Sequence, residues 1–126
     1  MSRAKVVWES DQTLVAAQSL GASGTKQSLF DFFGKGYASV RMQLKVIFGV
    51  AAAGNVTLNV YPSCDAGVSF DHTAAFSKTV TGASGATRSE SIDLTGIPYA
   101  RIDVVNADAA NAHNVQVKYA GRTWEE

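Results

Sequence analysis

An internal repeat is the feature that most constrains how this chain can fold. The residues Gly21–Gly24 read Gly-Ala-Ser-Gly, and the same four residues recur 61 positions later at Gly82–Gly85. Further matches keep one order in both halves, namely Asp-x-Thr, Gly-Ala-Ser-Gly, Asp, Gly, Tyr-Ala and Asn-Val. Small shifts in offset fall between the matches, where loops tolerate insertions. The sequence therefore predicts one domain over residues 1–126, with repeat halves at about 11–61 and 71–120.

Alternating apolar and polar side chains predict that both halves consist of β-strands, because successive residues of a strand point to opposite faces. The clearest alternation runs from Tyr37 to Phe48. The same pattern predicts strands at 56–60, 100–104 and 115–119, and weaker patterns predict strands at 5–8, 13–20, 28–33, 73–80 and 87–94. No segment has a helical period. The Ala-rich pieces 50–53 and 107–112 could form a short helical turn but are interpreted by default as loops of small residues.

These strands are separated by turn-forming residues, a spacing typical of a β-sandwich or jelly roll. A half of four strands leaves one apolar face bare, so we expect the two halves to pair their faces around one core. The predicted fold is an all-β, antiparallel sandwich of about eight strands with approximate two-fold symmetry. The repeated Gly-Ala-Ser-Gly segment is predicted to be a hairpin loop in which glycines supply positive φ.

Charge and hydropathy exclude several classes of partner. Lys plus Arg (11) equals Asp plus Glu (11), so no net field attracts nucleic acid or anionic lipid. The longest apolar stretch, Val46–Ala53, is too short to span a bilayer, and the N-terminal apolar run is too short for an export signal. We expect synthesis in the cytoplasm, with neither nucleic acid nor membrane as a partner. Charged residues make up 17% of the chain, below the usual share of about 25%, which suits a surface that meets other protein.

Catalytic machinery is not predicted. His72 and His113 are the only histidines, and both are expected in polar, turn-like surroundings without a catalytic or metal-binding role. The single cysteine, Cys64, lacks the signature of a nucleophile and is predicted to be a small, partly buried thiol. The Gly-Ala-Ser-Gly segments are not phosphate-binding loops, because neither is followed by Lys-Ser/Thr and a helix. No cofactor is expected.

Acidic residues in one predicted loop leave a calcium site as an alternative. Oxygens of Asp65, Gly67 and Asp71 could surround such an ion, since sandwich loops often bind calcium in this way. Their spacing matches no defined calcium loop, so we favour a turn that joins two strands.

Equivalent residues of the two halves have structural interpretations. Asp31 and Asp93 alternate with apolar neighbours and are predicted to lie on the solvent face of strands. Tyr37 and Tyr99 begin equivalent strands and are predicted to cap the core.

Aromatic and arginine residues near the two ends of the chain are the candidates for protein contacts, because Trp, Tyr and Arg are enriched at interfaces. These residues are Trp8, Tyr119, Arg122 and Trp124. Each Trp could instead seal one end of the core. Exposed aromatic rings on a sheet could also stack on sugars, which leaves a carbohydrate- or surface-binding module as an alternative function.

Three segments resemble small virion proteins of tailed bacteriophages. They are Asn55–Asp71, Ile97–Ile102 and Val117–Trp124. The resemblance implies a non-enzymatic head, neck or tail subunit of a virion, made in the host cytoplasm, that contacts other virion proteins as a capsid decoration protein, a collar or connector, or a tail component. Because a duplicated domain presents two similar surfaces, the expected assemblies are homo-oligomers such as trimers or hexamers.

Overall fold

The computed structural model describes the backbone of residues 5–125 and the side chains of residues 9–123. Within that range the chain is all-β, as predicted, with nine strands and one helical turn. In chain order the elements are β1 (Lys5–Trp8), β2 (Gln12–Leu20), β3 (Thr25–Asp31), α1 (Phe32–Lys35), β4 (Tyr37–Ile47), β5 (Val56–Ser63), β6 (Phe76–Val80), β7 (Thr87–Thr95), β8 (Tyr99–Asn106) and β9 (His113–Glu125). Each predicted strand is present, and the largest difference in length is at β9, which is longer at both ends.

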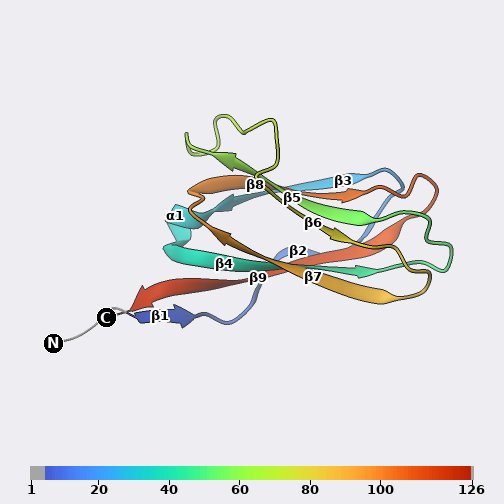
Figure 1. Ribbon diagram of the computed structural model, residues 1–126, viewed down its shortest axis with the longest axis horizontal. Helices are drawn as coiled ribbons and strands as arrows, with labels where there is room; N and C mark the ends of the chain where they lie inside the picture. Colours follow the sequence, from blue (N-terminus) through green and yellow to red (C-terminus); the bar gives the residue numbers. More distant parts are fainter. Residues whose placement is uncertain (1–4, 126) are drawn as a thin grey trace.

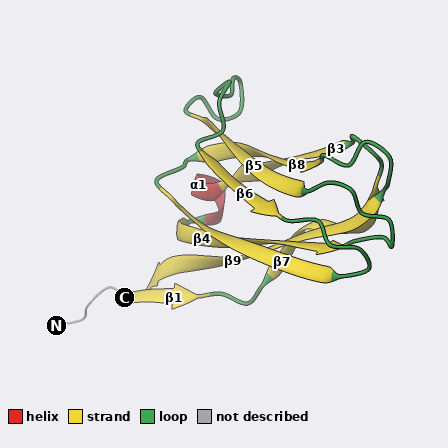
Figure 2. Ribbon diagram, turned by 45° about the vertical axis from the view of Figure 1, so that its right-hand side comes forward, coloured by secondary structure: helices red, strands yellow, loops and turns green. Residues whose placement is uncertain are grey.

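The strands form two antiparallel sheets that face each other, as the two layers in Figure 1 show. Sheet A has the order β2–β9–β4–β7. Strand β1 lies on the same side of β9 as β2 and pairs with the C-terminal end of β9. Sheet B has the order β3–β8–β5–β6. The turned view in Figure 2 shows the two layers with loops at either end. This arrangement is a jelly-roll sandwich.

The internal repeat is visible in the strand order. By sequence, β2 to β5 correspond to β6 to β9, and replacing each strand of sheet A by its counterpart yields β6–β5–β8–β3, which is sheet B. The expectation that each half would present one apolar face is wrong, because each sheet takes two strands from each half. The chain crosses between the sheets at most connections, so both halves close on one shared core.

The repeated Gly-Ala-Ser-Gly segments are not hairpin loops, because each joins a strand of one sheet to a strand of the other. In the first copy the Gly24 amide donates to the Gly21 carbonyl at 2.9 Å, and Ser23 takes the positive φ of 56°. In the second copy the turn lies one residue later: the Ala86 amide donates to Ala83 at 3.1 Å, and Gly85 has a φ of 68°. This displaced turn takes up the one-residue insertion between the halves.

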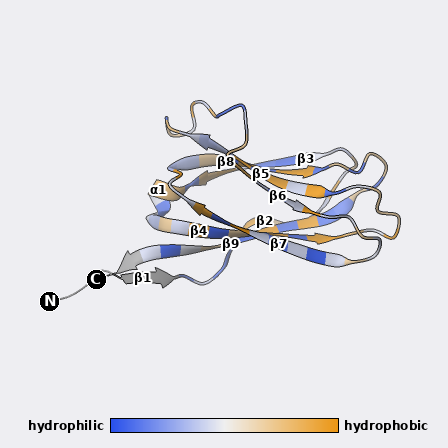
Figure 3. Cartoon of the chain, in the orientation of Figure 1, coloured by the Kyte–Doolittle hydropathy of each residue, from blue (hydrophilic) through white to orange (hydrophobic). Residues whose placement is uncertain are grey.

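The core lies between the sheets and follows the predicted alternation. In β4 the even positions from 40 to 46 are buried and the odd positions from 41 to 47 are exposed. Figure 3 shows the resulting bands of hydrophobic and hydrophilic residues along the strands. The largest fully buried apolar side chains include Phe30, Met42, Leu44, Leu58, Leu94 and Ile102.

The one helical turn lies where a strand was predicted to continue. The predicted strand 28–33 ends at Asp31, whose carboxylate accepts a hydrogen bond from the Gly34 amide at 2.8 Å and caps α1. Gly36, with a φ of 70°, ends the turn. The helix buries Phe32 and leaves Phe33 81% exposed. The Ala-rich pieces 50–53 and 107–112 form loops, the structure expected of them by default.

Candidate functional site

Four connections meet at one end of the sandwich, on the right in Figure 1, which we call the loop end. They are residues 21–24, 48–55, 81–86 and 107–112. Asp108 is the only Asp, Glu, Lys or Arg in these segments. Backbone hydrogen bonds join the connections, such as those from Ser23 N to Asp108 O and from Phe48 N to Ala86 O, both 2.9 Å. The loop end is therefore a linked surface of small, uncharged residues around one buried carboxylate.

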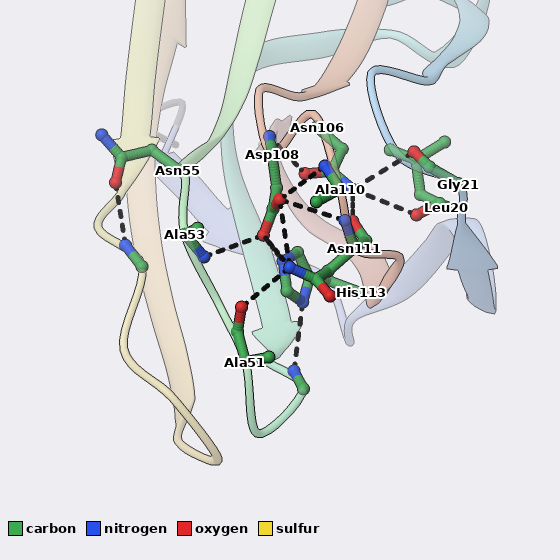
Figure 4. A network of polar contacts seen from close by, with 12 residues as sticks. Leu20, Gly21, Ala51, Ala53, Asn55, Asn106, Asp108, Ala110, Asn111 and His113 are labelled. Atoms are coloured by element: carbon green, nitrogen blue, oxygen red, sulfur yellow. Dashed lines mark hydrogen bonds and ion pairs between the residues drawn. The ribbon is translucent and has the colours of Figure 1, made fainter.

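Asp108 is the centre of a buried polar network (Figure 4), with 1% of its surface exposed. One carboxylate oxygen accepts from the Ala53 amide and from His113 Nε2, both at 2.9 Å. The other accepts from the Ala110 and Asn111 amides, both at 3.0 Å. These bonds, led by those from Ala53 and Ala110, hold the pKa of Asp108 well below its ordinary range, although burial acts in the opposite direction.

His113 is buried, with 2% of its surface exposed, and begins β9. The prediction of a polar, turn-like environment is thus wrong for this residue. Its Nδ1 lies 3.1 Å from the Gly49 amide nitrogen, and a backbone N–H can only donate, so Nδ1 must be unprotonated. The ring proton is therefore on Nε2 and is donated to Asp108. The lone pair on His113 Nδ1 accepts the Gly49 amide, so this Asp–His pair is not available as a general base.

The hydrogen bonds of this network hold the connection 48–55 against the connection 107–112. Gly49 donates to His113, the Ala51 carbonyl accepts from Asn111 Nδ2 at 2.8 Å, and Ala53 donates to Asp108. Alternate residues of one loop are therefore held by side chains of the other, as the dashed lines in Figure 4 show.

Sequence reasoning missed this network, although the repeat held a signal for it. In the alignment of the two halves, the apolar Leu44 and Val46 match Asn106 and Asp108. Asn106 is fully buried and donates through Nδ2 to the carbonyls of Leu20, Gly21 and Asn111 at 3.2, 3.2 and 2.9 Å. When one half has polar residues where the other half has apolar core residues, a buried polar network is indicated.

The loop considered for calcium is held by serines. The Asp65 carboxylate accepts from the Ser63 hydroxyl at 2.7 Å and from both the amide and the hydroxyl of Ser69. The bonds from Ser69, followed by that from Ser63, lower the pKa of Asp65 from 3.8 to about 2. Asp71 has its own amide bonded to Pro62. Among the side chains that the structure describes, no three from His, Cys, Asp or Glu gather to hold a metal ion.

The opposite end of the sandwich, which we call the α1 end, carries α1 and the connections 64–75 and 96–98. Two hollows of about 220 and 480 Å³ lie there, and Phe33 and Pro98 line both. Cys64 lines the larger hollow and is exposed, which corrects the expectation of a partly buried thiol. Val68, in the same connection as Cys64, is 85% exposed.

The predicted contact residues have different positions. Tyr119 lies in the core, 7% exposed, with its ring 4.7 Å from that of Phe30, so it is not a surface contact. Arg122 is half-buried. The backbone of Trp8 pairs with Arg122, and that of Trp124 with Val6, while both tryptophan side chains lie outside the described part.

The paired residues of the two halves partly match their predicted roles. Asp31 and Asp93 are both exposed, as predicted; Asp31 caps α1, and Asp93 accepts from Arg41 at 2.7 and 3.1 Å. That bond, with smaller contributions from the charges of Arg41 and Arg122, lowers the pKa of Asp93. Tyr37 is half-buried; its burial, with smaller contributions from Tyr119 and a hydrogen bond to Glu9, raises its pKa to about 12.

On the outer face of sheet B, an arginine side chain lies over the ring of Tyr61. The Arg101 guanidinium lies 4.5 Å from the centre of the Tyr61 ring and donates to Asp103 at 3.1 Å. Nearby, the Ser77 hydroxyl donates to Asn59 at 2.7 Å. These polar and aromatic groups of the outer face of sheet B thus contact one another.

Comparison with known proteins does not assign this chain to a family. No protein-family model matches the chain, and a search of curated proteins finds no significant match. Among residues 5–125 there is also no helix whose length and hydrophobicity would let it cross a bilayer.

Proposed function

We propose that this chain is a non-enzymatic structural subunit of a bacteriophage particle that acts through protein–protein contacts. The observation that carries the proposal is the ring of Phe33, which is 81% exposed between two hollows at the α1 end. Aromatic side chains that insert into a partner, next to hollows that accept partner side chains, supply much of the energy of protein interfaces.

Two further arguments support the proposal. The buried His113 and Asp108 use their hydrogen-bonding groups to hold loops, which leaves the surfaces as the parts that can act. By analogy of fold alone, jelly rolls serve in viral capsids, in agreement with the three segments that resemble phage virion proteins. The proposed partners are other virion proteins, with the chain as a capsid decoration protein, a collar or connector, or a tail component. The proposed location is the virion.

The alternative of a carbohydrate-binding module has less support on the outer face of sheet B, where Arg101 lies over the ring of Tyr61. We therefore retain protein contacts as the proposed mode of action.

The experiment compares Phe33→Asp with Val50→Asp, which changes an equally exposed apolar residue (89%) at the loop end. Phages that encode each variant are purified, and the copies of the chain per particle are counted by quantitative mass spectrometry. We expect Phe33→Asp to lower incorporation at least tenfold with an unchanged circular dichroism spectrum, and Val50→Asp to be incorporated normally. Normal incorporation of Phe33→Asp would remove the basis of the proposal.

Native mass spectrometry tests the proposed self-association. A trimer or hexamer of the purified chain is expected, and a monomer at high concentration would contradict this part of the proposal.

A further inference from the structure

We propose that His113 is a proton-operated latch, and that uptake of a proton at its Nδ1 releases the Gly49 amide at the start of the connection 48–55. This inference concerns the loop end and does not depend on the proposed function. It rests on three features of the described residues: the tautomer of His113, the charge beside it, and the shallow burial of the loop that it holds.

The tautomer makes the contact sensitive to protons. At Nδ1 a lone pair accepts the Gly49 amide at 3.1 Å, while the Nε2 proton is donated to Asp108 at 2.9 Å. When Nδ1 takes a proton from water, the ring becomes an imidazolium with a donor at each nitrogen. The Nδ1 proton then faces the Gly49 proton, so this hydrogen bond becomes a repulsive contact. The Nε2 bond to Asp108 remains and gains charge assistance.

The charge beside the ring favours the protonated form once the loop has moved. Asp108, from the connection 107–112, is the charged group that contacts His113, with a carboxylate oxygen 2.9 Å from Nε2. From β2, Leu20 pairs with His113, and the Phe48 ring lies 5.0 Å away in an edge contact. Asp108 therefore supplies a counter-ion for the imidazolium, and the Gly49 amide is the group that opposes it.

The Gly49 amide can move away from His113 without unfolding the core, while the bonds of Ala51 with Asn111 and of Ala53 with Asp108 hold the rest of the connection. Residues 49–51, 53 and 55 are exposed and residues 52 and 54 are half-buried, so moving them uncovers little apolar surface. The buried Phe48 marks the base of the loop. Because the closed position of Gly49 disfavours a proton on Nδ1, the contact between Gly49 and His113 weakens as the pH falls.

The test measures amide hydrogen exchange by NMR between pH 8 and pH 5, corrected for intrinsic rates. On acidification, we expect the protection of the Gly49 amide to fall by up to tenfold per pH unit, the slope of a one-proton linkage. The Val117 amide in the centre of β9 should keep its protection. In His72→Gln the response should persist, because His72 is the other histidine of the chain, and in His113→Gln it should disappear.

Two results would overturn the latch: the same acid response of Gly49 in His113→Gln, or loss of protection at Val117 in step with Gly49. If His113→Gln does not fold, the His72→Gln variant is used instead. His113 is then the one histidine of the chain, and its ring is titrated by ¹⁵N NMR. A shared midpoint for the ring and for Gly49 exchange supports the latch. Protonation of the ring while Gly49 stays protected refutes it.

Discussion

The ring of Tyr37 lies directly over the backbone of Gly121, so closely that a Cβ atom at position 121 would overlap the ring. The equivalent residue of the second half, Tyr99, packs in the same way against Gly67, where a Cβ would be 2.8 Å from the ring. Both tyrosines begin a central strand at the α1 end. Each half thus closes that end of the core with an aromatic ring placed on a glycine.

Replacing this glycine should destabilise the fold. Gly121→Ala places a methyl group inside the volume of the Tyr37 ring, and forcing an extra carbon into a packed site costs about 1–3 kcal/mol. Urea unfolding measures the loss. The matched control is Gly21→Ala, where a Cβ meets nothing within 4 Å, and which should change the unfolding free energy by less than about 0.5 kcal/mol. Equal effects of the two changes would show that the ring does not require glycine.

Exchanging a network residue for its counterpart in the other half should also be costly. Asn106→Leu installs the residue type of Leu44 but leaves three backbone carbonyls and the Asp108 amide without the Asn106 side chain. We expect a loss on the order of 3 kcal/mol, because buried unsatisfied groups are expensive. Chemical denaturation measures it. Asn114→Leu, at an exposed position of β9, is the control and should be near neutral.

The Asp65 loop should respond to acid at an unusually low pH. The pKa of Asp65 is about 2 instead of 3.8, so its hydrogen bonds with Ser63 and Ser69 favour the ionised form. The stabilisation is complete above about pH 4 and is lost as the pH falls through about 2. NMR titration of the Ser69 amide, which is bonded to this carboxylate, should show a midpoint near pH 2 that disappears in Asp65→Asn. A midpoint near pH 4 would mean that the serine contacts are not maintained in solution.

The thiol of Cys64 should react in the folded protein. It is exposed and lines a hollow at the α1 end beside Phe33. Ellman's reagent should therefore modify one thiol per chain without denaturant, and Cys64→Ser should show no reaction. Because a bulky adduct would occupy that hollow, modified chains should also enter particles poorly. A thiol that reacts only after denaturation would contradict the exposed position.

Sequence patterns predicted the local part of the structure well. Alternation located the strands because the direction of each side chain follows from its neighbours in the chain, and the repeat revealed the approximate symmetry. One wrong prediction also has a local cause. The strand predicted over 28–33 ends early because Asp31 caps α1 and Gly36 ends it.

The sequence by itself determined that this chain makes β-strands in two similar halves, and roughly where along the chain each strand lies. Only the tertiary structure decided which strands are neighbours, so it also decided that Tyr119 is buried, that Cys64 is exposed and that His113 holds Gly49. These outcomes depend on contacts between residues far apart in the chain, such as the 64 positions between Gly49 and His113. Alternation specifies which face of a strand is apolar but leaves open the strand that will cover it, because burial is set by the partner and not by the strand itself.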